Sequence, residues 1–380
     1  MLYNGIKVTF LIGQTVPKPA PPMILEALRN VEVKHTDEGM SGFQITFALG
    51  KGLKSASKDF ALLKSPLLKP PNRMIILVTF NAKPTVLMDG IIQHQQLSPG
   101  QEVGSTTLTI TGNDVSVMMD KEKVKSKHPA QSEDVIALKL ISKYSKYGLT
   151  PNVIKPSSAE TPSLTDTIPV QDETDFKYLK KLADKFAYDF YIISGPAPGV
   201  NKAYWGPPAT KGTPQRALSV DMGTFTNVES ISFQYDAKKP QKVKGKIQDK
   251  KTQKEVSINI SAPSATRLPL SKNPSWKESM ETTDLGTMEG YTAQQARTAA
   301  QRITDRSVDQ VVTATGDLDS LRYGNILKPR GLVGLRGVGY SYDGNYYVKE
   351  VSHKITREKY KQTFTLTRDG LGALLPVVVP

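Results

Sequence analysis

QDETDFKYLKKLADKFAYDFYII, residues 171–193, joins a helical pattern directly to a strand pattern. Asp172 and Thr174 are candidate N-cap residues for the helix. Apolar side chains then recur at helical spacing with lysines between them, at Phe176, Leu179, Leu182, Ala183 and Phe186. Tyr188, Phe190 and Ile192 follow in alternation, which is the spacing of a strand. The segment predicts an amphipathic helix that leads straight into a β-strand, and none of its side chains indicates catalysis.

The composition is that of a globular protein with several domains. A chain of 380 residues is too long for one ordinary core, so about two to four domains are expected. Hydrophobic residues make up 38% and charged residues 23%, while 28 glycines and 26 prolines favour a β-rich fold with many turns. The chain has no cysteine, which excludes disulfides, thiolate metal sites and thiol nucleophiles.

The first residues and the apolar runs predict no membrane insertion. Met1 to Gln14 contains an alternating apolar run and a single early lysine, so it predicts a first strand and not a signal peptide. No apolar run approaches the roughly 20 residues that a transmembrane helix needs.

The basic charge is local. The net charge is +14, and lysines are concentrated in 121–127 (KEKVKSK) and 237–254 (AKKPQKVKGKIQDKKTQK). Neither run has interleaved aromatic residues or the arginines that a nucleic-acid platform favours. We therefore predict a solvated or docking face for acidic protein surface, with Lys242, Lys244 and Lys246 as interface candidates, and no nucleic-acid partner.

Strand patterns dominate both ends of the chain. Residues 1–114 contain several short alternating runs, and Asp89-Gly90 is a dipeptide that favours a hairpin turn. Ser132 is the expected N-cap of a helix that ends before Gly148. Alternating residues predict further strands at 231–235, 243–247 and 256–260, and Thr292 with Gln295 predicts a capping box.

Three stretches resemble the late-control D and VgrG family, the baseplate hub proteins of contractile phage tails and related injection systems. In 171–193 the resemblance lies in the acidic cap followed by D-F-x-x-L-x-x-L-A and Y-x-F-Y-I. Residues 108–120 (LTITGNDVSVMMD) resemble the strand-Gly-x-Asp-helix junction that ends the first barrel of hub proteins. Within 309–368, the resemblance is carried by GDLDSLRYGNILKP (316–329), DGNYYV (343–348), VSHKI (351–355) and YKQTFTLT (360–367).

The resemblance implies a mainly β fold with α+β inserts, made of two β-barrel-like tube domains with small α/β and helical insert domains. The expected boundaries are 1–115 for the first tube domain and 116–208 for the α/β insert. The second tube domain is expected at 209–258 and 308–370, with a small helical insert at 259–307 and a C-terminal tail at 371–380. Such a duplication is implied by the family, although the residues show no strong internal repeat.

The same resemblance implies a structural function. A homotrimeric hub adapts a six-fold tail tube to a three-fold spike, so the expected partners are further copies of the chain, the spike protein, the tail-tube protein and other baseplate components. Because no OB-type domain follows the second barrel, the spike is expected to be a separate protein. Assembly is expected in the cytoplasm, as part of a phage tail or injection-system particle, and no enzymatic activity or cofactor is expected.

Few residues are candidates for chemistry. The four histidines, His35, His94, His128 and His353, lie in different expected elements, so no metal site is predicted. Asp317 and Asp319 are a possible carboxylate pair for glycoside hydrolysis, but beside Gly316 they are better interpreted as turn aspartates. A tail-associated cell-wall hydrolase and a basic nucleic-acid-binding protein are the alternative functions.

The end of the chain is a candidate interface. Leu374, Leu375, Val377, Val378 and Val379 form an apolar run after the last expected strand. Such a run marks either a docking element for the spike or a segment that folds back onto its own barrel.

Overall fold

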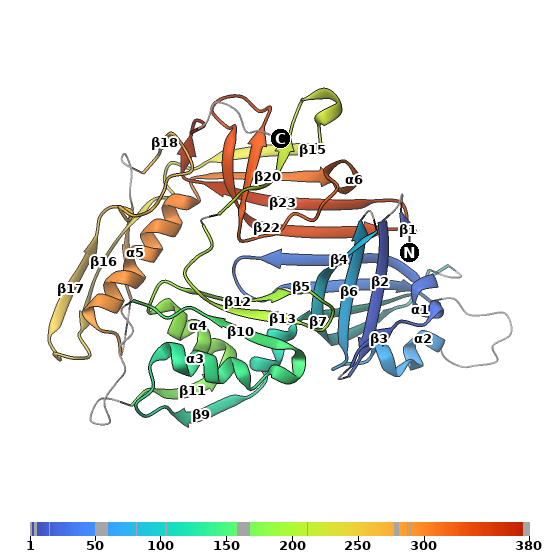
Figure 1. Ribbon diagram of the computed structural model, residues 1–380, viewed down its shortest axis with the longest axis horizontal. Helices are drawn as coiled ribbons and strands as arrows, with labels where there is room; N and C mark the ends of the chain where they lie inside the picture. Colours follow the sequence, from blue (N-terminus) through green and yellow to red (C-terminus); the bar gives the residue numbers. More distant parts are fainter. Residues whose placement is uncertain are drawn as a thin grey trace.

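The structure is a computed structural model of the chain, and it describes residues 2–3, 6–14, 16–49, 60–80, 82–102, 105–157, 168–210, 212–276, 281–286, 288 and 290–374. It confirms a mainly β fold with α+β inserts. Most strands belong to one 14-stranded sheet, and the three longer helices of the described chain, α3 (Glu133–Ser142), α4 (Asp175–Asp184) and α5 (Ala293–Asp309), lie in smaller units at its side (Figure 1). Buried apolar side chains of the described residues form four clusters, two within the large sheet and two in the inserts.

The first sheet unit comes from the first 114 residues. Its strands are β2 (Ile6–Gly13), β4 (Leu28–Thr36), β5 (Gly42–Ala48), β6 (Arg73–Phe80), β7 (Lys83–Ser98) and β8 (Thr107–Asp114). They hydrogen-bond in the order β2-β6-β7-β8-β5-β4, and every pair is antiparallel. Alternate residues such as Leu108 and Ile110 of β8 are buried, because one face of the sheet covers a core that α1 (Pro22–Glu26) helps to close with Ile24. The short strands β1 (Leu2–Tyr3) and β3 (Lys18–Pro19) pair with β2, and α2 (Ala61–Lys64) lies between β5 and β6.

The second sheet unit repeats this strand order. Its strands are β14 (Gln215–Ser219), β15 (Val228–Tyr235), β20 (Val312–Asp319), β21 (Leu332–Arg336), β22 (Gly344–Thr356) and β23 (Tyr360–Arg368). They pair as β14-β21-β22-β23-β20-β15, which is the order of the first unit strand for strand. A short helix follows the third strand of each unit, α2 in the first and α6 (Ser320–Tyr323) in the second. One difference is that β14 runs parallel to β21, whereas β2 runs antiparallel to β6.

The two sheet units are joined edge to edge. The outer strand of the first unit, β4, pairs antiparallel with β22 over seven residues, from Glu350 opposite Thr36 to Thr356 opposite Asn30. Figure 1 shows these strands, blue β4 and red β22, side by side at the centre of the molecule. Ile355 and Tyr360 of the second unit are consequently buried in the core of the first. The halves of the chain therefore share one continuous sheet.

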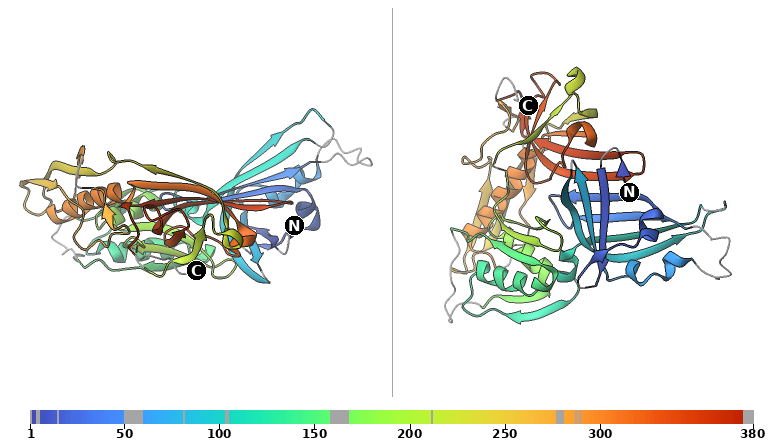
Figure 2. Two further views of the ribbon diagram at one scale, coloured as in Figure 1. Left: turned by 90° about the horizontal axis from the view of Figure 1, so that it is seen from above. Right: turned by 45° about the vertical axis from the view of Figure 1, so that its right-hand side comes forward.

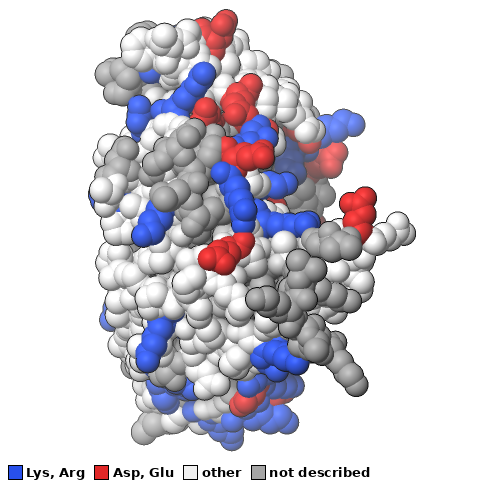
Figure 3. Space-filling view, turned by 90° about the vertical axis from the view of Figure 1, so that its right-hand side faces the viewer, with Lys and Arg blue, Asp and Glu red and all other residues white. Residues whose placement is uncertain are grey.

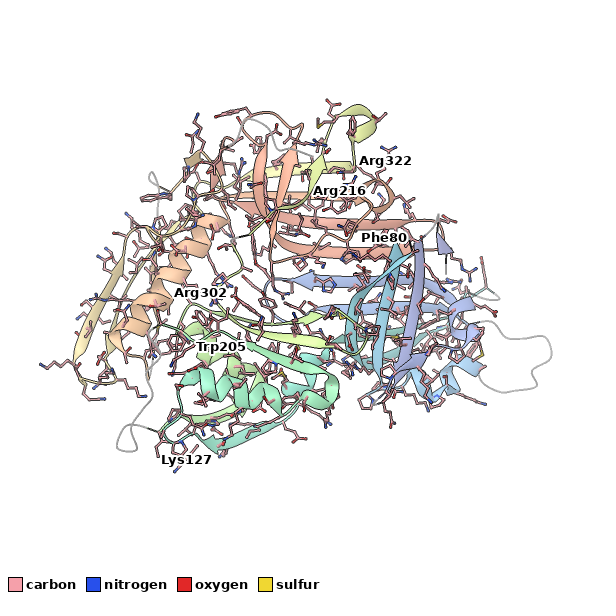
Figure 4. All side chains as sticks on the ribbon, viewed as in Figure 1. Phe80, Lys127, Trp205, Arg216, Arg302 and Arg322 are labelled. Carbon is pink, nitrogen blue, oxygen red and sulfur yellow. The ribbon has the colours of Figure 1, made fainter. Side chains whose placement is uncertain are left out.

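The α/β insert follows the first unit. It contains β9 (Lys123–Lys127), α3 (Glu133–Ser142), β10 (Leu149–Val153), β11 (Val170–Thr174), α4 (Asp175–Asp184), β12 (Asp189–Ser194) and β13 (Asn201–Gly206). The helix and strand expected from 171–193 are confirmed: Thr174 caps α4 by accepting a hydrogen bond from the Lys177 N–H at 3.3 Å, and β12 follows. Trp205, fully buried, donates its indole N–H to the Leu179 carbonyl at 3.1 Å and fixes α4 on β13 (Figure 4).

A second small unit, here called the α5 module, lies between β15 and β20. It consists of β16 (Gln241–Gln248), β17 (Glu255–Ile260), β19 (Glu281–Asp284) and α5 (Ala293–Asp309), and α5 begins with the capping box expected at Thr292. Strand β16 lies between β17 and β19 in a separate sheet, although 209–258 was expected in the second tube domain. The reason is packing: Val243 and Ile247 are buried against Ala296 and Ala300 of α5.

The hairpin turn expected at Asp89-Gly90 is wrong, because both residues lie inside the long strand β7. Asp89 is fully buried and accepts two hydrogen bonds of 2.7 Å from the guanidinium of Arg73. A Cβ on Gly90 would lie 2.4 Å from the Asn113 carbonyl oxygen, so glycine is required here for close strand approach and not for a turn. The chain instead reverses between Phe80 and Lys83, where Ala82 has a φ of 63°.

Candidate functional site

Two of the free edges of the large sheet are candidates for assembly. Among the described strands, β15 is an outer strand of the second unit and pairs with β20 alone. Strand β7 pairs with β6 as far as Ile91, so Gln93–Ser98 has β8 as its only partner among the described strands. The left view of Figure 2 shows this part of β7 and β8 (cyan) projecting from the body of the molecule. Unpaired backbone N–H and C=O groups along such edges are available to another chain.

A cavity of about 740 Å³ lies between the α5 module and the rest of the chain. Arg302 of α5 reaches across to the α/β insert, where it donates to the Asp189 carboxylate and the Tyr188 carbonyl (Figure 4). Arg306 donates to the same carboxylate at 3.0 Å and lies 3.5 Å from Glu38. On the module's other side, Arg267 in the loop after β17 lies 3.3 Å from the carboxylate of Asp369, which follows β23 of the second unit. These ion pairs hold the α5 module against the body.

The charges that line this cavity balance each other. Five carboxylates (Asp37, Glu38, Asp189, Asp305 and Asp309) face five cations (Arg267, Arg297, Arg302, Arg306 and Lys349). Asp305 accepts hydrogen bonds from the Ser264 N–H at 2.7 Å and the Gln301 amide at 3.0 Å. Most of these carboxylates are thus structural acceptors, and the lining selects neither an anionic nor a cationic ligand.

Asp37 is the exception in the cavity. Burial raises its pKa to about 6, which Lys349 only partly offsets, and its Oδ1 has no hydrogen-bond partner. Its backbone N–H donates to the Lys349 carbonyl at 3.0 Å, beside the first residues of the β4–β22 ladder. The sequence carried no signal for this group, since an aspartate in a strand-end turn is ordinary.

The predicted lysine interface is an exposed face. Lys242, Lys244 and Lys246 alternate along β16 with Val243 and Ile247, which point to α5, so the lysines lie on the opposite side of the sheet. Lys246 forms an exposed ion pair of 2.8 Å with Glu255 of β17. The opposite side of the molecule, which Figure 3 shows, has Lys and Arg side chains interspersed with Asp and Glu over its upper half.

The predicted C-terminal interface is described only at its beginning. Strand β24 (Gly370–Leu371) pairs with β18 (Asn273–Pro274), and Leu374 is half exposed at 52%. Leu375, Val377, Val378 and Val379 lie outside the described residues. The structure therefore leaves the choice between docking and folding back as a prediction.

The candidates for chemistry are held in structural hydrogen bonds. Asp317 accepts from the Thr363 hydroxyl at 2.7 Å, and Asp319 caps α6 by accepting from the Leu321 N–H at 2.9 Å. Both lie on β20 and not in a turn, because Gly316 is a strand residue that allows the Ser230 carbonyl to approach.

The sequence missed one histidine pair. His35 and His353 lie on neighbouring strands with ring centroids 5.5 Å apart, and burial lowers the pKa of both, that of His35 to about 4. His353 shares a 2.9 Å hydrogen bond with the Tyr360 hydroxyl. Two neutral imidazoles in a core are packing groups. In the ranges that the structure describes, no cluster of three or more His, Asp or Glu residues is arranged to hold a metal ion.

The described part of the chain contains no helix that is long and apolar enough to cross a bilayer. Neither a family model nor a curated protein matches the sequence.

Solved structures do share the fold. A tail protein from Neisseria meningitidis MC58 is 13% identical with a TM-score of 0.64, over 97% of this chain and 98% of that one. The 43 kDa tail protein of prophage MuSo2 from Shewanella oneidensis is 12% identical with a TM-score of 0.61, over 95% and 98%. An E. coli component of the type VI secretion system is 12% identical with a TM-score of 0.55, over 93% of this chain and 77% of that one. At these identities the likeness establishes a common fold, which is that of phage tail and type VI secretion proteins.

Proposed function

We propose that the chain is a structural hub of a contractile tail or injection-system baseplate, a homotrimeric adapter between a six-fold tail tube and a three-fold spike. The observation that carries the proposal is the repeated strand order of the two sheet units, β2-β6-β7-β8-β5-β4 and β14-β21-β22-β23-β20-β15. A chain with two similar units presents six of them in a trimer, whereas each insert is presented three times. The whole-length likeness to tail proteins supports the same assignment.

The oligomeric state tests this proposal. Multi-angle light scattering over a concentration series is expected to show a homotrimer, stabilised when the cognate spike protein is added. A chain that stays monomeric at high concentration, even with the spike present, contradicts the adapter function.

The lysine face of β16 is proposed to meet acidic protein surface in the assembled particle. Substitution of glutamate for Lys242, Lys244 and Lys246 is expected to reduce incorporation into particles, because an acidic partner surface would then be repelled and not attracted. All three lie opposite the α5 core, so the fold should be retained. Intact incorporation with loss of DNA binding would instead support the nucleic-acid alternative.

The C-terminal run is proposed to dock on the spike. Deletion of 374–380 is expected to leave a folded hub that no longer retains the spike in a pull-down. Aggregation of the truncated chain supports the fold-back alternative, and retained spike binding contradicts the docking role.

The two carboxylates considered for a cell-wall hydrolase do not favour that function. Asp317 and Asp319 are used as structural acceptors. A turbidity assay on purified cell walls tests this alternative, and clearing that Asp317→Asn abolishes would support it.

A further inference from the structure

We infer that β15 of one copy pairs with the free stretch of β7, Gln93–Ser98, of a second copy, and so repeats between chains the β4–β22 joint found within the chain. This inference rests on the proposed homotrimer and specifies its interface. The partner is therefore another copy of this chain, and the contact is an antiparallel strand pairing.

The joint within the chain supplies the template. Strand β22 pairs with β21 up to Tyr347. From Glu350 onwards, the same edge of β22 pairs with β4. Strand β7 occupies the position of β22 in the first unit, and it pairs with β6 up to Ile91. Beyond that point its edge has no partner strand in the described chain. The first unit thus has the acceptor half of the joint, unoccupied.

The donor half is present on the second unit. Strand β4 is the outermost strand of the first unit and β15 is the outermost strand of the second. The edge of β4 is covered by β22, whereas the equivalent edge of β15 has no partner strand in the described chain. One joint within each chain and one between successive chains would link six units in a closed head-to-tail ring, in which the edges of β15 and β7 are both covered.

The residue pairing of the β4–β22 joint can also be transferred to β15 and β7. His353 lies six residues beyond Tyr347 and pairs with Val33, and Leu97 lies six residues beyond Ile91. Val33 is linked through Phe43 to Gly112, and Phe233 is linked in the same way through Ala314 to Leu366. Gly112 and Leu366 are equivalent, because each pairs with the residue just before the register shift of its long strand, Ile92 in β7 and Val348 in β22. The transferred ladder therefore places Phe233 of one copy opposite Leu97 of the next, and Tyr235 opposite Gln95.

The exposure of residues on both strands supports the pairing independently. Leu97 is 38% exposed, whereas its counterpart His353 is fully buried, and Tyr235, which the ladder places opposite Gln95, is 42% exposed. The neighbouring Gln95 has a buried amide nitrogen without a hydrogen-bond partner. Strand β15, VESISFQY, also contains neither the lysine nor the proline that commonly protects a permanent free edge. Pairing with a second copy would bury Leu97 and Tyr235 and would cover the unprotected edge of β15.

The charged residues near Val228, at the start of β15, agree with antiparallel pairing. In an antiparallel ladder, the residues after Leu97 run toward Val228 at the start of β15. They include Glu102, the one acidic residue of the β7–β8 loop. Beside the start of β15 lies a cavity of about 320 Å³ lined by Arg216, Arg322 and Arg336, the first two of which are labelled in Figure 4. Among the described residues, neither Arg216 nor Arg336 forms an ion pair.

Disulfide trapping tests the inference. Because the chain has no cysteine, no native thiol competes with the introduced pair. Directly opposed residues in an antiparallel pair have Cα atoms about 4.5–5.5 Å apart, within the range that a disulfide spans. The double variant Leu97→Cys/Phe233→Cys is expected to oxidise to a covalent trimer on non-reducing gels. The double variant Gln96→Cys/Phe233→Cys is the matched control, because a shift of one residue places the two side chains on opposite faces.

A charge on the edge provides the second measurement. Leu97→Lys is expected to weaken self-association by about tenfold or more, since it buries a lysine in the joint. Leu138→Lys is the control, because Leu138 of α3 is 46% exposed and lies outside the proposed joint. A trimer that forms but traps neither disulfide, and tolerates Leu97→Lys, overturns the strand pairing and leaves the hub function standing. A chain that forms no oligomer overturns both.

Discussion

The buried ion pair between Arg73 and Asp89 is expected to fasten the α/β insert to the first sheet unit. Their side chains are 4% and 0% exposed and share two hydrogen bonds of 2.7 Å. Arg73 also donates to the carbonyls of Tyr147 at 2.7 Å and Gly199 at 3.1 Å, and Asp89 accepts from the Asn201 amide at 2.9 Å. One guanidinium therefore connects β6 and β7 to two loops of the insert.

Asp89→Asn keeps the shape of this site and removes its negative charge, so the Arg73 cation stays buried without a counter-ion. Breaking a buried pair in this way costs about 3–5 kcal/mol. The lower end, about 3 kcal/mol, is expected here because the two carbonyls continue to solvate the guanidinium. Urea unfolding followed by Trp fluorescence measures the loss, since Trp205 is buried in the insert core.

The double variant Arg73→Met/Asp89→Leu removes both charges together. It is expected to lose only about 1–2 kcal/mol, which is the cost of leaving two carbonyls and an amide less well bonded. If Asp89→Asn changes the unfolding free energy by less than about 0.5 kcal/mol, or if the double variant is as unstable as the single one, the reasoning is refuted.

Two further predictions concern the cavity beside α5. The pKa of Asp37 in the folded chain, about 6, exceeds the ordinary value of 3.8. Relative to Asp37→Asn, the parent chain is therefore expected to lose stability as pH rises from about 4 through 6, by at most roughly 3 kcal/mol. Thermal unfolding of both chains against pH measures this difference, because the buried His35 and His353 affect both chains alike. Asp189→Asn is expected to cost about 1–3 kcal/mol and to speed hydrogen exchange in α5, because it weakens the contacts of Arg302 and Arg306. Asp184→Asn is the near-neutral control, since Asp184 is 57% exposed and 3.7 Å from Arg302.

Local signals in the sequence were sufficient for local structure. The segment 171–193 and the Thr292 capping box both form as predicted. Each depends on residues within one or two turns of the chain, so spacing alone specifies it.

Strand partners could not be predicted in the same way. Alternation shows which face of a strand is buried but not which strand lies beside it. The pairing of β4 with β22 joins residues more than 300 positions apart, and β16 has a pattern that any half-buried sheet would accept. The repeat of the two units is likewise carried by strand order and by matching register shifts in the ladders, and not by a clear repeat in the residues. Asp89 was misassigned because Asp-Gly favours turns, and its buried partner Arg73 comes from another strand.

The two units share a strand order but have different insertions. The surfaces of the molecule therefore fall into two classes. Surfaces that belong to the strand order, such as the short helices α2 and α6, occur twice per chain and six times in the proposed trimer. The α/β insert and the α5 module occur once per chain and three times in the trimer. A six-fold tube needs the first class, because a surface presented three times leaves every second tube subunit without a contact. The lysine face of β16 belongs to the second class. Its acidic partner is therefore to be sought among the components that surround the hub or follow the three-fold spike, and not on the tube.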